Sequence, residues 1–157
     1  MPTSGAIADW KFPLIPKLQL SGAFFTGKGL DAFGGLALPS VQPQDYLHYL
    51  YATAPNLAGI PVVGGWSQLK FTLNSRNEFN AAGGVGARDA GRLRASAPFD
   101  PLLLSVPSSN RVVFFNYIFR PRSDLLFSAE YRHFHTSPIS GTPNVADQIG
   151  LAAGFLF

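Results

Sequence analysis

Apolar and polar side chains alternate at every second position along seven segments of this 157-residue chain. In the segment RVVFFNYIF, Val113, Phe115, Tyr117 and Phe119 are apolar, and Asn116 belongs to the intervening set. Because successive side chains of a β-strand point to opposite faces, a period of two predicts strands with one apolar and one polar face. These segments of nine to thirteen residues are longer than the usual strand of about five or six, and they cover residues 6–14, 17–28, 65–73, 77–85, 111–119, 124–134 and 145–157.

The composition favours an apolar β protein. Charged residues make up 13% of the chain, about half the share usual in soluble globular domains. The 16 glycines and 13 prolines supply turns, and an aromatic content of 13% argues against disorder. A net charge of +3 is no signature of nucleic-acid binding, and the absence of cysteine excludes disulfides and thiolate metal sites.

Short and long connections alternate between the predicted strands. Short turns are expected at residues 15–16, 74–76 and 120–123, and long loops at about 29–64, 86–109 and 137–144. In an up-and-down meander this alternation places the short turns at one rim of the sheet and the long loops at the other. Together with long strands and a continuous apolar face, it predicts an all-β, antiparallel, up-and-down transmembrane β-barrel within a single domain, residues 1–157.

Alternation alone does not say which face is inside. A soluble, lipocalin-like barrel that binds an apolar ligand would turn its apolar face inward, whereas a membrane barrel turns it toward lipid. Strand length, the asymmetry of the loops and the apolar terminus VADQIGLAAGFLF favour the membrane barrel. Its water-filled lumen would then be lined by the charged residues of the polar face, namely Asp9, Lys11, Lys17, Lys70, Glu78, Glu130 and Arg132.

The chain resembles a family of porin-like outer-membrane barrels. The segments DWKFPL, KLQLSGAFFTGKGL, GGWSQLKFTL, NRVVFFNYIFRPRSDLLFSAEYRHFHT and ADQIGLAAGFLF are similar to the C-terminal third of such barrels from acidobacteria. The resemblance implies a bacterial outer-membrane location, passive diffusion of small solutes, and contact with outer-membrane lipid and the barrel-assembly machinery. It also implies an assembly signal at the terminus, formed by Ile149, Leu151, Ala153, Phe155 and Phe157.

The strand count predicts that this sheet is part of a larger barrel. A periplasmic C-terminus, which the resemblance implies, puts the start of the first of seven strands on the extracellular side, whereas single-chain bacterial barrels have an even number of strands. The missing strands would come from an upstream region. A homo-oligomer is the other expected partner, since porin-like barrels often form trimers. The alternative is an eighth strand within residues 29–64 that completes a small barrel.

Other functional patterns are weak. His133 and His135 share a strand face, but no third metal ligand is evident, and Ser137 beside His135 lacks the orienting partner of a hydrolase. Residues 43–55 have the pattern of a short helix or a surface loop. The sequence therefore predicts no catalytic residue, metal or cofactor, and a porin-like channel is favoured over the soluble barrel and, more remotely, over an outer-membrane hydrolase.

Overall fold

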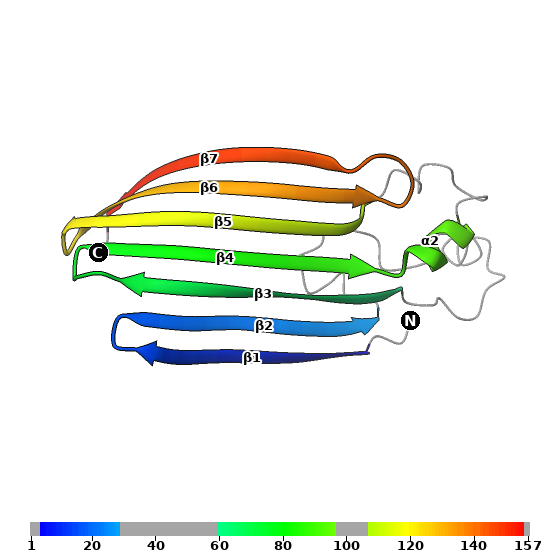
Figure 1. Cartoon of the computed structure of the whole chain (residues 1–157), viewed down its shortest axis with the longest axis horizontal. Helices are drawn as coiled ribbons and strands as arrows, with labels where there is room; N and C mark the ends of the chain where they lie inside the picture. The colour runs from blue at the N-terminus through cyan, green and yellow to red at the C-terminus, as the bar shows by residue number, and fades with distance from the viewer. Residues whose placement is uncertain (1–3, 29–59, 97–106, 156–157) are drawn as a thin grey trace.

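Seven long strands form one sheet. The structure, a computed structural model, describes residues 4–28, 60–96 and 107–155, so the segment 43–55 and Phe157 lie outside the described residues (Figure 1). The strands are β1 (Ser4–Ile15), β2 (Leu18–Lys28), β3 (Pro61–Thr72), β4 (Asn77–Arg88), β5 (Pro107–Arg122), β6 (Leu125–Pro138) and β7 (Asn144–Phe155), and helix α2 (Ala90–Ser96) follows β4.

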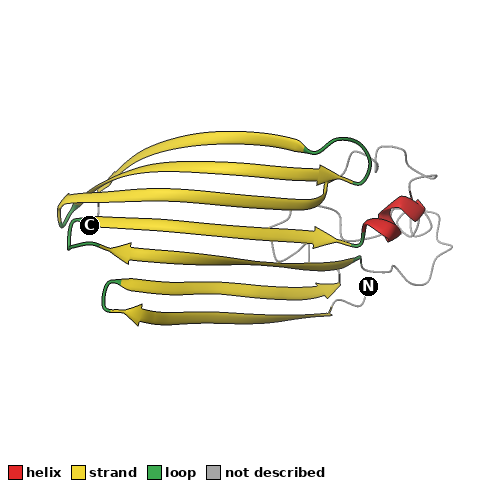
Figure 2. Cartoon of the chain, viewed as in Figure 1, coloured by secondary structure: helices red, strands yellow, loops and turns green. Residues whose placement is uncertain are grey.

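The sheet is an up-and-down meander. Its strands lie in the order β1-β2-β3-β4-β5-β6-β7, and each pairs antiparallel with the next one in sequence (Figure 2). The three short turns lie at one end of the sheet, and the longer connections start and finish at the other (Figure 1). The predicted all-β, up-and-down architecture is confirmed. Within the described residues β1 and β7 do not pair with each other, so the sheet is open.

Five of the seven strands, β1 and β3 to β6, are longer than their sequence pattern suggested. β3 begins at Pro61, where residues 29–64 had been assigned to a loop, because Val62 and Gly64 continue the ladder with Gly27 and Phe25 of β2. β4 extends to Arg88 and is followed by α2, which the sequence analysis did not predict. The side chain of Asp89 begins this helix, since its Oδ1 atom accepts hydrogen bonds from the backbone N–H groups of Gly91 and Arg92.

Two turns are displaced from their predicted positions. Ile15 is the last residue of β1, and the first turn is formed by Pro16 and Lys17. β5 continues to Arg122, although residues 120–123 have the composition of a turn. The backbone N–H of Arg120 donates to the carbonyl of Arg76 at 2.8 Å, which holds β5 in the sheet beyond the predicted end.

The strand lengths match a membrane. The shortest strand has 11 residues, and at about 3.3 Å per residue it extends for roughly 36 Å. Inclined at about 45°, such a strand rises roughly 26 Å, close to the height of about 25 Å typical of the apolar band of an outer-membrane barrel. The described sheet therefore has the dimensions of a membrane-spanning wall.

The sheet has almost no apolar core. The buried hydrophobic residues of the described chain are Ile60, Val62, Ala82 and Ile139. By contrast, Ile149 and Leu151 are 79% and 81% exposed, and the other exposed large apolar side chains range from 36% to 68%. An apolar surface of this extent is costly in water, so the sheet requires an apolar environment against that surface.

Candidate functional site

The register sorts the side chains into a polar and an apolar face. Residues directly opposite on neighbouring strands share a face, so each chain of register partners is a row across the sheet. One row of the polar face runs from β1 to β7 as Pro13, Gln19, Lys70, Asn80, Asn116, Glu130 and Gly150. The adjacent row of the apolar face contains Phe12, Leu20, Leu69, Ala81, Phe115, Tyr131 and Ile149.

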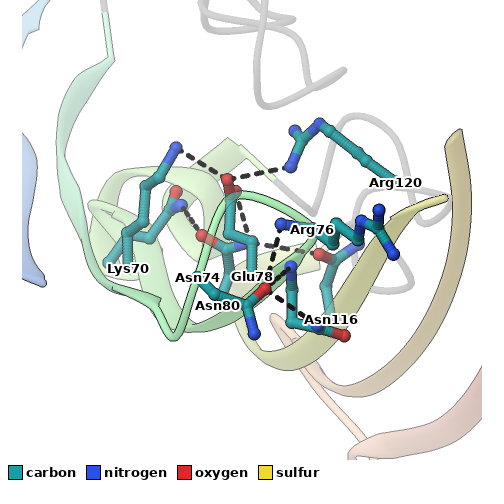
Figure 3. A network of polar contacts seen from close by, with 9 residues as sticks. Lys70, Asn74, Arg76, Glu78, Asn80, Asn116 and Arg120 are labelled. Carbon is teal, nitrogen blue, oxygen red and sulfur yellow. Dashed lines mark hydrogen bonds and ion pairs between the residues drawn. The ribbon is translucent and has the colours of Figure 1, made fainter. Parts of the chain in front are cut away.

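Glu78 is the centre of an ionic network on the polar face. Its Oε2 atom lies 2.9 Å from Nζ of Lys70 on β3 and 3.3 Å from Nη1 of Arg120 on β5 (Figure 3). The side-chain amide of Asn80 donates to the other carboxylate oxygen at 3.1 Å. Glu78 is only 7% exposed, and two cations with an amide donor compensate for the loss of water around its carboxylate.

Amide side chains extend this network across three strands. Nε2 of Gln68 on β3 donates to Oδ1 of Asn80 on β4 at 2.9 Å, and Nδ2 of Asn80 donates to Oδ1 of Asn116 on β5 at 3.1 Å. Asn80 and Asn116 are direct register partners, so their side chains meet on the same face. Because the side chains fix one another by hydrogen bonds, this part of the polar face is a preorganised hydrophilic surface.

The predicted lumen-lining residues occupy different places. Lys70 and Glu78 meet in the network, and Glu130 and Arg132 of β6 form an ion pair on the same face. Asp9 and Lys11 lie at polar-face positions of β1, opposite Ala23 and Ser21. Lys17 lies in the first turn.

In that turn, Nζ of Lys17 donates to the backbone carbonyl of Leu73 at 3.0 Å. The contact joins the short turns of the two neighbouring hairpins, so Lys17 belongs to the rim of the sheet. The assignment of these seven residues to the lumen depends on which face is inside, and it stays a prediction.

Several network residues were not singled out by the sequence analysis. Arg120 was assigned to a turn, and Gln68, Asn80 and Asn116 were recognised only as polar-face residues. The alternation could have identified them, because Asn80 lies on the same strand face as Glu78, and Asn116 lies on the same strand face as Arg120. Arg88, which is 7% exposed, lies on the polar face of β4 near the longer connections.

The predicted assembly signal lies on the apolar face of the last strand. Ile149, Leu151, Ala153 and Phe155 of β7 alternate with residues of the polar face. Ile149 and Leu151, the first two of this set, are the most exposed large hydrophobic side chains of the described chain, and Phe155 is 65% exposed. β7 therefore presents a ridge of apolar side chains beside an edge that no described strand pairs with, and the role of this ridge in assembly stays a prediction.

A polar cluster interrupts the apolar face near the longer connections. Nδ1 of His133 on β6 lies 2.8 Å from Oδ1 of Asp147 on β7, and the hydroxyl of Tyr131 donates to the same oxygen at 2.6 Å. The described residues contain no group of three side chains suited to hold a metal ion. None of their helices is long and apolar enough to span a bilayer.

Strand order, strand length and two-faced patterning define the class: the sheet is part of a barrel wall of the outer-membrane type. No family model matches the chain, and no curated protein matches it. Among solved structures, the chain is similar to the crystal structure of the outer membrane channel DcaP of Acinetobacter baumannii, with a TM-score of 0.74 and 15% sequence identity.

The similarity covers 99% of this chain and 41% of that channel. The chain therefore spans less than half the length of the barrel protein that it matches. At this identity the likeness establishes the fold, and the fold is that of a porin-like barrel wall.

Proposed function

We propose that the protein forms a porin-like channel in a bacterial outer membrane, through which small solutes diffuse passively. The observation that carries the proposal is the division of the sheet into a face of exposed apolar side chains and a face with the Lys70–Glu78–Arg120 network. The similarity in fold to an outer membrane channel supports it further. The apolar face would contact lipid, and the polar face would line a water-filled pore.

The path of the apolar band across the sheet supports this assignment of the faces. One register row begins with Ala8 and Phe24 on β1 and β2 and reaches Arg111 and His135 on β5 and β6. In a row nearer the short turns, the polar residue lies on the earlier strand and the apolar residues lie on the later ones. This row runs from Asn77 of β4 to Phe119, Phe127 and Ala153 of β5, β6 and β7.

The apolar band therefore shifts toward the short turns from β1 to β7. This shift is expected where the strands of a barrel are inclined, because a band parallel to the membrane then crosses the hydrogen-bonded rows at an angle. The outer surface of a soluble barrel has no apolar band that must run parallel to a membrane.

We also propose that the open edges of β1 and β7 are closed by further strands. An unpaired edge in hydrocarbon leaves backbone N–H and C=O groups unsatisfied, and each such group costs several kcal/mol. The partner strands would come from an upstream segment or from further copies of the chain, within a barrel delivered by the assembly machinery. The resemblance of the chain to barrels of the acidobacterial type is consistent with this arrangement.

Conductance across a planar bilayer tests the proposal. Purified protein in which the sheet is closed should produce discrete steps of current in concentrated KCl. The double variant Lys70→Gln/Glu78→Gln should keep the steps but alter their size, because both side chains would border the water-filled path. The matched variant Ser4→Thr, at the outer end of β1, should leave the steps unchanged. A protein that inserts without conducting, or that is recovered as a soluble species binding an apolar ligand, would contradict the proposed function.

A further inference from the structure

An open groove crosses the apolar face over the middle of the sheet. It has a volume of about 510 Å³, and its walls include Phe79, Phe115, Tyr117 and Tyr131, with the smaller Ala81 and Ala129 beside them. The rings of Phe79 and Tyr117 stack with their centroids 4.9 Å apart, which fixes one wall of the groove. On a surface that faces hydrocarbon, a groove of this kind suits a flexible acyl chain.

Polar side chains border one end of this groove. Tyr131 belongs to both features, since its ring lines the groove and its hydroxyl donates to Asp147. Two and four residues beyond it on the same strand face lie His133 and His135, and Arg111 is the direct register partner of His135 on β5. On β6 the groove lies at Ala129 and Tyr131, and His133 and His135 follow it toward the end of the strand. That end of the sheet bears the longer connections (Figure 1).

The charges of the cluster favour an anionic partner. The Asp147 carboxylate already accepts hydrogen bonds within the cluster, from Tyr131 and His133. Arg111 is exposed, and the structure gives neither its guanidinium nor the His135 ring a hydrogen bond or ion pair with another described residue. A guanidinium and an imidazole side by side offer N–H donors that match the oxygens of a phosphate group.

We propose that this part of the apolar face is a binding site for a phosphorylated lipid. One acyl chain would occupy the groove along Ala81 and Ala129, and the phosphate would be held by Arg111 and His135, with His133 beside them. The inference rests on the proposed function and on the usual orientation of an outer-membrane barrel, with short turns on the periplasmic side and longer connections facing outward. The occupant is then lipid A, the phosphorylated membrane anchor of outer-leaflet lipopolysaccharide.

Native mass spectrometry of the closed barrel in detergent tests the site. The protein is titrated with lipid A that carries two phosphates and with the same lipid after both phosphates have been removed. The phosphorylated form should bind at least about tenfold more tightly, because a single charge-assisted hydrogen bond already contributes this much and the site offers two donors. Equal affinities for the two forms in the unmodified protein would overturn the inference without any mutation.

Variants identify the residues responsible. Arg111→Gln/His135→Gln should abolish the preference for the phosphorylated form, whereas Arg122→Gln, which removes a cation at the short-turn rim, should retain it. Ala129→Trp should fill the groove and weaken binding of both forms. If Ala129→Trp instead changed the number of associated copies and left lipid binding intact, the groove would be a contact between subunits and the inference would be wrong.

Conductance separates this inference from the proposed function. A barrel that conducts but shows no preference for the phosphorylated lipid contradicts the lipid site alone. A barrel that prefers the phosphorylated lipid but does not conduct contradicts the channel alone.

Discussion

An arginine on the apolar face of β5 should prevent the barrel from inserting, whereas an arginine one residue further along should not. Phe115 lies on the apolar face and is 55% exposed, and Asn116 is its neighbour on the polar face. β5 runs from Pro107 to Arg122, so Phe115 is roughly 23 to 26 Å along the strand from either end. At an inclination of about 45° its side chain lies close to the midplane of the membrane.

The size of the difference follows from the face on which each side chain lies. At the midplane an arginine that faces lipid costs about 2–4 kcal/mol, which corresponds to roughly 30- to 700-fold in the folding equilibrium. Asn116→Arg avoids this cost, because its side chain would enter the pore. It loses the hydrogen bond from Asn80, a change of about 0.5–1.5 kcal/mol. Phe115→Arg should therefore be the more destabilising variant, by at least about 0.5 kcal/mol and by about 2 kcal/mol at the centres of the two ranges.

Urea-dependent folding into lipid vesicles measures both variants on the closed barrel. With a urea dependence of about 2 kcal/mol per molar, the folding midpoint of Phe115→Arg should fall by roughly 1–2 M, and that of Asn116→Arg by roughly 0.3–0.8 M. Heat-modifiable migration on gels provides an independent count of folded molecules. Equal midpoints, or a larger shift for Asn116→Arg, would refute the assignment of the two faces.

Three further predictions follow from other parts of the sheet. Glu78→Gln leaves Lys70 and Arg120 without their carboxylate, so the barrel should lose about 1–3 kcal/mol of folding stability. The reversal potential in a KCl gradient should also move toward anion selectivity. The control Asp9→Asn, at an exposed polar-face position, should change stability little. Gly22→Ala should destabilise the barrel by about 1–3 kcal/mol, because the added Cβ would lie 2.4 Å from the Trp10 ring and 2.5 Å from the backbone oxygen of Trp66. Gly150→Ala, whose Cβ would have its nearest neighbour at 4.0 Å, should be neutral in the same urea titration. Deleting Phe157 should lower the fraction of heat-modifiable protein in cells while leaving refolding in vesicles nearly unchanged, as an assembly signal requires, and equal losses in both assays would indicate a structural role instead.

The alternation of side chains predicted the sheet because it depends only on backbone geometry. Each segment with a clear period of two, such as 111–119, lies within a strand of the structure, and its alternate residues share one face of the sheet. The strand ends were harder to predict, since residues such as Gly64 and Arg120 interrupt the pattern or resemble turns. Their backbone groups nevertheless pair with a neighbour, and pairing of this kind depends on register that no single segment contains.

The candidate site was predicted in part for the same reason. The parity of Lys70 and Glu78 put both on the polar face, and the structure brings them to 2.9 Å. The roles of Arg120 and Asn116 depend on how β5 is aligned with β4, which distant residues determine. The contact between His133 and Asp147 likewise requires the alignment of β7 with β6.

The central claim is that the apolar face contacts lipid and the polar face contacts water. Because the chain has no cysteine, single cysteines can be introduced at each position from 111 to 119 of β5 and spin-labelled in the membrane-inserted barrel. Accessibility to oxygen, which is concentrated in hydrocarbon, should peak at the odd positions 113, 115, 117 and 119, and accessibility to a water-soluble nickel complex should peak at positions 112, 114, 116 and 118. An inverted phase, or accessibility without a period of two, would contradict the account.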